Sequence, residues 1–158
     1  MNLSTSPADD GLIPTHFVRY NRPLRALLIE QQAWFLVRDL SKLVNRPIEA
    51  QLISRLDHDQ SRQERLAGIP GPELLVSESG LYALLLIYCP HPENRSLRQW
   101  LTNEVVPTLR DASNLDARLP RRRMQHLLGE SLPVMDWQGN LWLRWRDAVG
   151  LLENHLRT

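Results

Sequence analysis

The sequence predicts an α+β fold, in which a small antiparallel sheet packs against several short helices and a strand–helix extension follows at the C-terminus. Runs of β-favouring residues separated by turn residues fill the first part of the chain, which indicates adjacent strands. Apolar residues then recur at helical spacing in two segments between residues 77 and 106. A chain of 158 residues can bury one core of ordinary size, so we expect one domain with an appendage.

The first elements predicted are a hairpin and its turn. Residues 1–14 are small, polar and acidic, so we expect a disordered tip there. From Thr15 to Ile29, β-favouring residues flank Asn21-Arg22-Pro23, whose residue types are typical of a turn. This pattern predicts two strands joined by a turn that presents Arg22 at its tip, with Arg19 and Arg25 beside it.

A third strand and two short helices should follow. Residues 33–37 are β-favouring and lead into an amphipathic helix over about 38–44, which Asn45 can end. Pro47 suits the first turn of a second short helix. Such a pair has the outline of a helix-turn-helix, but short helix pairs also occur throughout globular proteins, and both interpretations stay open.

The middle of the chain predicts the buried centre of the domain. Residues 57–71 are highly charged and end in glycine and proline, which predicts an exposed loop. Residues 73–76 predict a short strand, and Ser77 is well placed to cap the helix that follows. Because that helix is apolar on nearly every side up to Cys89, we expect it to be buried all round.

A second amphipathic helix should cover residues 93–106 and stop at Pro107. Residues 111–120 resemble a linker, and the run Arg121-Arg122-Arg123 follows them. A triple arginine suits contacts with phosphates, but a solvated helix start explains it equally well.

The C-terminal segment echoes an earlier one. The run Trp34-Phe35-Leu36-Val37-Arg38-Asp39 is matched 108 positions later by Trp142-Leu143-Arg144-Trp145-Arg146-Asp147. Gln138-Gly139-Asn140 would then form a hairpin turn, and a final helix would run from about Asp147 to His155. A duplicated strand–helix unit and chance similarity both explain the echo. The unit is too small for its own core, so we expect it to pack against the first domain or across a dimer interface.

Basic residues are unevenly placed, although the whole chain has a net charge of only +1. Between residues 15 and 56 there are seven basic and three acidic side chains, which gives this segment a net charge of +4. Nearly all basic residues of the chain are arginine, whose fork of donors suits phosphates and guanine edges. The segment therefore predicts a nucleic-acid surface.

Catalytic chemistry is not indicated. The five histidines are scattered without the His/Cys spacing of a zinc site, and the sequence has no glycine-rich phosphate loop or serine elbow. We therefore expect no enzyme, no metal site and no cofactor. The longest apolar run, Leu81–Cys89, is too short to span a membrane, and the single cysteine, Cys89, suits a reducing cytoplasm.

Four motifs follow one another within residues 15–110. They are Pro23-Leu24-Arg25, then Trp34-Phe35 with Arg38-Asp39-Leu40, then the run from Val76 to Leu84, and finally the run from Leu97 to Pro107. In order and spacing they resemble the BRO-N domain of baculovirus repeated-ORF proteins and prophage antirepressors. The resemblance implies a small α+β domain that binds nucleic acid, with residues 121–158 as an extension beyond the linker.

Two functions stay open. In the first, the chain is a phage-derived regulator that binds double-stranded DNA, with its contacts on Arg19, Arg22, Arg25, Arg38, Arg46, Arg55, Arg121, Arg122 and Arg123. In the second, it is an antirepressor that binds a repressor or another regulatory protein without touching DNA. In either case we expect a cytoplasmic homodimer, with a partner interface at Trp137, Trp142 and Trp145.

Overall fold

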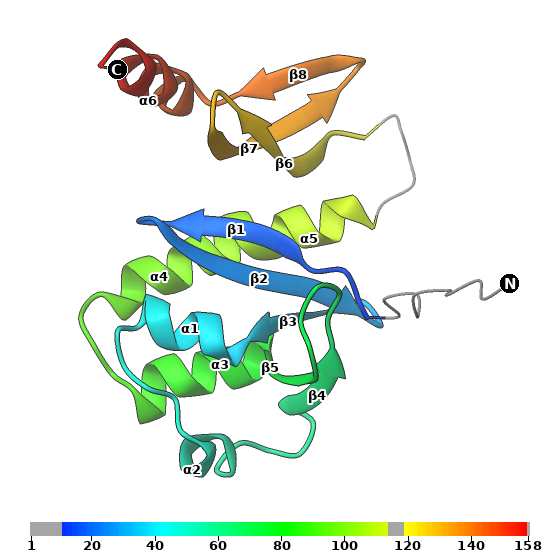
Figure 1. Cartoon of the computed structure of the whole chain (residues 1–158), viewed down its shortest axis with the longest axis vertical. Coiled ribbons are helices and arrows are strands. Elements are labelled where there is room, and N and C mark those ends of the chain that lie inside the picture. Colours follow the sequence, from blue (N-terminus) through cyan, green and yellow to red (C-terminus); the bar gives the residue numbers. More distant parts are fainter. Residues whose placement is uncertain (1–10, 114–118, 158) are drawn as a thin grey trace, which may run out of the picture. The chain divides into compact units, whose positions relative to one another are not determined.

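The computed structural model describes residues 11–113 and 119–157 and forms two compact units, Met1–Asn94 and Arg95–Thr158. Both units contain strands and helices, which confirms the predicted α+β class (Figure 1). Every helix in the described part of the chain is too short or too polar to cross a membrane. Most of the predicted N-terminal tip lies outside the described residues, but Leu12, also assigned to the tip, forms a β-bridge with Leu66.

A five-stranded antiparallel sheet forms the frame of the first unit. Its strand order is β1-β2-β3-β5-β4, with bounds β1 (Thr15–Arg19), β2 (Arg22–Ile29), β3 (Gln32–Leu36), β4 (Ser61–Arg65) and β5 (Pro72–Ser77). Alternation along β3 turns Trp34 to one face of the sheet and Phe35 to the other. Both side chains are buried, so the central strand is covered on its two faces.

The turn between β1 and β2 differs from the prediction. Tyr20 and Asn21 have positive φ angles of 50° and 63°, the geometry of a two-residue hairpin turn. Arg22 is therefore the first residue of β2, opposite Arg19, and not the tip of the turn. The pair Glu30-Gln31, also with positive φ, makes a second turn of this kind between β2 and β3.

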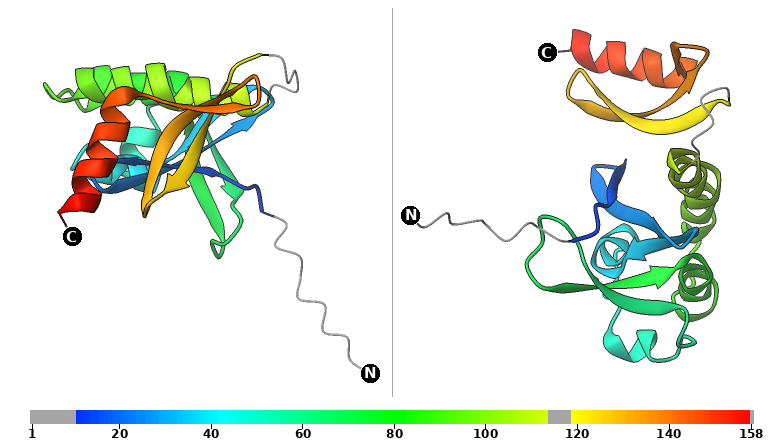
Figure 2. Two further views of the ribbon diagram at one scale, coloured as in Figure 1. Left: turned by 90° about the horizontal axis from the view of Figure 1, so that it is seen from above. Right: turned by 90° about the vertical axis from the view of Figure 1, so that its right-hand side faces the viewer.

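The first unit has three α-helices and a π-helical segment among its described residues, namely α1 (Val37–Leu43), α2 (Ala50–Ile53), α3 (Glu78–Ala83) and η1 (Leu84–Tyr88). α1 and α3 pack against the central strands (Figures 1 and 2). Asn45 has a φ of 52° and follows α1, as predicted, but α2 begins at Ala50 and not at Pro47. With a single turn, α2 is too short to lie along a major groove. The helix-turn-helix interpretation therefore has no recognition helix at this position.

Two further predictions for this region were wrong. The segment expected as a charged loop contains β4, which pairs with β5 as the edge strand of the sheet. Its charged residues suit an edge, because charge discourages pairing with foreign strands. The apolar helix before Cys89 is not buried all round, since Leu86 and Ile87 are 63% and 66% exposed.

Ser77 caps α3, as predicted. Its buried hydroxyl accepts a hydrogen bond from the backbone N–H of Gly80 at 3.1 Å. We expect Ser77→Ala to lower the free energy of unfolding by about 1 kcal/mol, the usual cost of losing an N-cap. Urea unfolding followed by circular dichroism measures the loss. Ser77→Gly, which removes the same hydroxyl but suits the N-cap backbone, should lose less, and an equal loss in both variants would argue against capping.

The second unit contains a long helical segment and a small sheet. The helical segment is made of α4 (Asn94–Trp100), the π-helical η2 (Leu101–Val105) and α5 (Val106–Ala112). The antiparallel sheet has the order β6-β7-β8, with bounds β6 (Arg121–Leu127), β7 (Glu130–Trp137) and β8 (Asn140–Leu143), and α6 (Trp145–Leu156) follows. The triple arginine therefore begins a strand, and its interpretation as a helix start was wrong.

Pro107 does not end the helix that it was predicted to stop. It lies in the first turn of α5, directly after the wide turn of η2. Proline has no N–H and so cannot donate to the carbonyl of Asn103, four residues earlier. The Arg122 guanidinium donates to that carbonyl at 3.0 Å. α5 then continues to Ala112, into the segment predicted as a linker.

A motif of three strands and a helix occurs in both units, and its register is the same in each. β2 pairs with β3 through Ala26↔Phe35, and β7 pairs with β8 through Val134↔Leu143. Each residue of the second pair lies 108 positions after its counterpart in the first. The other pairs of the two ladders are offset by the same amount.

The turns and helices of the two motifs also correspond. Positive φ angles at Tyr20-Asn21 and Glu30-Gln31 have counterparts at Leu128-Gly129 and Gln138-Gly139. α1 begins directly after β3, and α6 begins at the corresponding position after β8. The sequence echo is thus part of a repeated β-β-β-helix motif in the structure.

Candidate nucleic-acid interface

Arg19 and Arg22 lie at the turn between β1 and β2. The Arg19 guanidinium lies over the exposed ring of Tyr20, 4.7 Å from the ring centroid. Arg22 is exposed and donates through Nη1 to the carbonyl of Lys42, near the end of α1. This hydrogen bond fixes the hairpin turn beside the C-terminal end of α1.

Arg25 forms a buried ion pair with Asp39 inside the first unit. Its Nε and Nη2 donate to the two carboxylate oxygens of Asp39, both at 2.9 Å, and its backbone N–H donates to Oδ2 at 2.9 Å. The Asp39 side chain is 1% exposed and that of Arg25 is 20% exposed. The hydrogen bond to Asp39 raises the pKa of Arg25, against the opposing effect of burial. With two of its three guanidinium nitrogens on Asp39, Arg25 is poorly placed to bind a phosphate.

Arg38 pairs with an acid from a neighbouring strand. Its Nη2 lies 2.7 Å from Oε1 of Glu73 on β5, and not against the adjacent Asp39. The Arg38 side chain is half exposed, so solvent reaches it. Its charge is balanced by Glu73, which reduces its value as a phosphate contact.

Arg46 and Arg55 come together around α2. Both line a hollow of about 210 Å³ on the surface of the first unit, together with Glu49 and Gln51. The Arg55 guanidinium lies 5.9 Å from the ring centroid of Tyr88, which supports it from one side. The two guanidinium groups are thus held at one hollow, where an anion can reach both.

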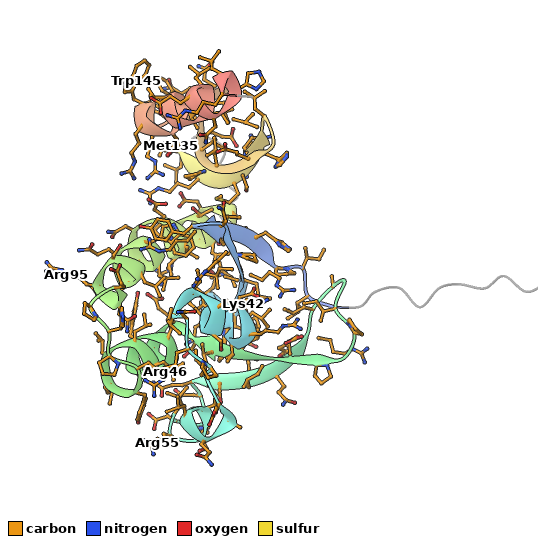
Figure 3. The ribbon with its side chains drawn as sticks, turned by 60° about the vertical axis from the view of Figure 1, so that its left-hand side comes forward. Lys42, Arg46, Arg55, Arg95, Met135 and Trp145 are labelled. Carbon is orange, nitrogen blue, oxygen red and sulfur yellow. The ribbon has the colours of Figure 1, made fainter. Side chains whose placement is uncertain are left out.

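We use the name basic band for Arg22, Lys42, Arg46 and Arg55. Figure 3 shows the last three one below another along the first unit. The side chains of Lys42, Arg46 and Arg55 are exposed and make no hydrogen bond or ion pair with another residue in the described part of the chain. Glu49 is the acid that lines the same hollow, so the band keeps an excess of positive charge. Exposed cations of this kind suit contacts with phosphates.

The triple arginine does not form one surface. Alternation along β6 turns Arg121 and Arg123 to one face and Arg122 to the other. Arg123 donates to Asp136, and this hydrogen bond lowers the pKa of that carboxyl. Arg122 holds the Asn103 carbonyl, and its backbone N–H donates to Asp111 at 2.9 Å. Arg122 and Arg123 therefore stabilise the second unit, and few of their hydrogen-bond donors remain available for a ligand.

The Arg-Asp pair of the second motif makes contacts unlike those of the first. Arg144 lies 2.7 Å from Glu104 and 2.6 Å from Asp147, and Arg146 lies 3.5 Å from Glu104. Burial lowers the pKa of Arg144, but its hydrogen bonds to Glu104 and Asp147 outweigh burial and raise it. These arginines are balanced by acids and do not extend the basic band.

The three predicted interface tryptophans lie on neighbouring elements of the second unit. The rings of Trp137 on β7 and Trp142 on β8 are 6.3 Å apart between centroids and tilted by 45°. Trp145 begins α6 and is 82% exposed. Trp142 also lines a pocket of about 310 Å³ with Met135 and Arg122. Trp137 and Trp142 thus form an exposed aromatic pair, and Trp145 adds a third exposed ring at the start of α6.

Sequence reasoning missed two residues at the basic band. Lys42 was counted as a charge but not as a contact, and its position in the last turn of a short helix was the available signal. Tyr88 supports Arg55, although its helical spacing assigned it to the apolar face. No group of three or more His, Cys, Asp or Glu side chains within residues 11–113 and 119–157 can hold a metal ion.

Comparison with protein-family models, curated proteins and solved structures finds no significant match for this chain. The likeness to the BRO-N domain therefore depends on the four sequence motifs alone.

Proposed function

We propose that the chain is a DNA-binding regulator of the BRO-N type, which holds the phosphates of double-stranded DNA on its basic band. The observation that carries this proposal is the group of three exposed cations, Lys42, Arg46 and Arg55, without an acidic partner in the described residues. Two of them, Arg46 and Arg55, line the same hollow, which brings unpaired positive charge together at one place. We place the protein in the cytoplasm, where DNA is accessible and Cys89 stays reduced.

The structure changes the set of contacts that the sequence favoured. Arg25, Arg122 and Arg123 leave the proposed surface because acids or carbonyls of the protein occupy them. Arg38 contributes less, since Glu73 balances its charge. The hairpin turn with Tyr20 remains the element suited to enter a groove, because its ring is 80% exposed and lies under the Arg19 guanidinium. Backbone contacts by the band would then position this turn.

The test is the salt dependence of DNA binding by the variant Arg46→Ala/Arg55→Ala. Each guanidinium that binds a phosphate contributes about 0.9 to the slope of log K against log salt, so the slope should fall by about 1.8. Affinity at low salt should fall roughly tenfold for each lost contact. Fluorescence anisotropy with a short random-sequence duplex measures both quantities.

The matched control is Arg65→Ala/Arg157→Ala, which removes the same charge from outside the band. Both residues are exposed and have no side-chain partner among the described residues. This variant should keep the wild-type slope and lose less than about threefold in affinity. An equal loss in both double variants would mean that net charge and not the band binds DNA. A wild-type chain that does not bind the duplex at low salt would reject the proposal.

A protein-binding antirepressor is the second candidate, and the exposed tryptophans favour it. Trp137, Trp142 and Trp145 are 38%, 53% and 82% exposed, and phosphate binding gives them no role. Apolar contacts of this kind persist at high salt, whereas phosphate contacts weaken steeply. Tight binding to a phage repressor at high salt, without measurable DNA binding at low salt, would favour this candidate.

A further inference from the structure

The β8 strand has an open edge. In the first unit, β3 pairs with β2 on one side and with β5 on the other. In the second unit, β8 pairs with β7, and no strand in the described part of the chain occupies its other side (Figure 1). Because β3 and β8 are equivalent in the repeated motif, the first unit shows what such an edge accepts, which is an antiparallel strand.

The side chains of β8 are more exposed than the equivalent side chains of β3. Ala33 and Trp34 of β3 are 1% and 4% exposed, while the equivalent Leu141 and Trp142 of β8 are 46% and 53% exposed. β8 contains neither charge nor proline, which are the usual means of protecting an edge from pairing. The edge is therefore both apolar and ready to accept a strand.

The turn before β8 determines which backbone groups point outward. Trp137 and Asn140 flank a two-residue turn and so form a hydrogen-bonded pair. Alternation then directs the N–H and C=O of Trp142 toward β7, and those of Leu141 and Leu143 toward the open edge. No backbone hydrogen bond from another described element reaches Leu141 or Leu143.

We propose that this edge pairs with the β8 strand of a second copy of the chain, antiparallel and across a two-fold axis, so that the two three-stranded sheets become one. Regular antiparallel pairing places residues with outward groups opposite each other. Of the registers that meet this condition, only the one with Leu141 of one copy opposite Leu143 of the other pairs both outward residues of each strand within the bounds of β8. Trp142 then falls on the axis, opposite Trp142 of the second copy.

Three properties favour a second copy over an unrelated strand. Two-fold pairing closes both open edges at once, because each copy supplies the same surface. Trp142 meets its counterpart in a non-hydrogen-bonded pair, where side chains come closest and aromatic pairs stabilise the sheet. Asn140 lies opposite Arg144 in this register, so no like charges oppose each other. This inference does not depend on DNA binding.

Disulfide crosslinking tests the position of the axis. In the full chain with the buried Cys89 replaced by alanine, the Trp142→Cys variant should form a covalent dimer under mild oxidation with oxidised glutathione. The two Cα atoms would be about 4.5 Å apart, within the range that a disulfide spans. Trp137→Cys in the same background lies one strand away from the axis and should remain monomeric on a non-reducing gel.

A proline in the open edge tests the pairing itself. The N–H of Leu141 points outward, so Leu141→Pro removes no hydrogen bond to β7 and should leave the circular dichroism spectrum unchanged. It removes two hydrogen bonds between the copies, one from the Leu141 N–H of each copy. We therefore expect the dimer Kd to rise at least about 30-fold. Sedimentation of the full chain should show a dimer of the 18.3 kDa chain for the wild type and a monomer for the variant.

Three results would overturn the inference. They are a wild-type chain that sediments as a monomer, a dimer that Leu141→Pro leaves intact, and equal crosslinking by the two cysteine variants. If Leu141→Pro fails to fold, the crosslinking comparison still decides the question. All these measurements are made without DNA, so their failure leaves the proposed DNA contact untouched.

Discussion

Asp39→Ala should lower the free energy of unfolding by about 3–5 kcal/mol, because it removes one partner of a buried ion pair. The Asp39 carboxylate accepts three hydrogen bonds from Arg25, one of them from the backbone of β2. Without the carboxylate, the part-buried guanidinium and a strand N–H lose their acceptor. The pair also ties α1 to β2, so its loss should loosen the contact between helix and sheet.

Asp136→Ala provides the matched control for this prediction. Asp136 also pairs with an arginine, Arg123, but both side chains are well exposed, at 44% and 38%. Exposed pairs contribute little, so urea unfolding followed by circular dichroism should detect a loss below about 1 kcal/mol. Arg25→Met/Asp39→Leu should recover part of the stability lost in Asp39→Ala, since it leaves no unpaired charge, while the backbone N–H of residue 25 still lacks its acceptor. Similar losses for Asp39→Ala and Asp136→Ala would contradict the structural role of the buried pair.

The same ion pair shows where sequence reasoning stops. Asp39 follows Arg38 in the chain, and adjacency alone would favour that arginine as its partner. Neighbouring residues on a helix point in different directions, so Arg38 reaches Glu73 while Asp39 turns toward β2. Arg25 belongs to the hairpin, and its approach to Asp39 depends on how α1 folds back over the sheet. No local spacing contains that information.

Strands and caps with strong local signals could be predicted, whereas elements that depend on neighbours could not. The hairpin strands, β5 and the Ser77 cap are readable because β-favouring runs, turn residues and capping residues act locally. β4 lacks an apolar alternation, since its residues are mostly polar at an edge, and only its pairing with β5 makes it a strand. Pro107 is tolerated because η2 widens the preceding turn, which no proline rule anticipates.

The positive charge of the candidate site could be predicted from the sequence, but the particular residues that form the site could not. The positive charge between residues 15 and 56 is a property of the sequence, and the basic band lies within that segment. Which arginines stay available depends on where the acids lie after folding. The sequence gives no reason to prefer Arg46 over Arg25 as a contact. In the structure, Asp39 binds Arg25, whereas Arg46 is exposed at a hollow.

Gly80→Ala should destabilise the first unit by about 2–3 kcal/mol, although alanine is ordinarily the better helix former. A Cβ at Gly80 would lie 2.7 Å from the backbone oxygen of Gln60 and 3.1 Å from its Cβ. That oxygen accepts the N–H of Ser77 at 3.0 Å, so moving it aside would break a bond at the start of α3. The cost of overpacking and of the lost hydrogen bond exceeds the gain in propensity.

Gly150→Ala is the matched substitution in α6, where a Cβ would meet no atom within 4 Å. It should stabilise the second unit by about 0.5–1 kcal/mol, because alanine reduces the conformational freedom of the unfolded chain without a clash. Urea unfolding of both variants should give shifts of opposite sign. If Gly80→Ala were also stabilising, the close approach of α3 to Gln60 would not exist, and the register between Ser77 and the start of β4 would have to be different.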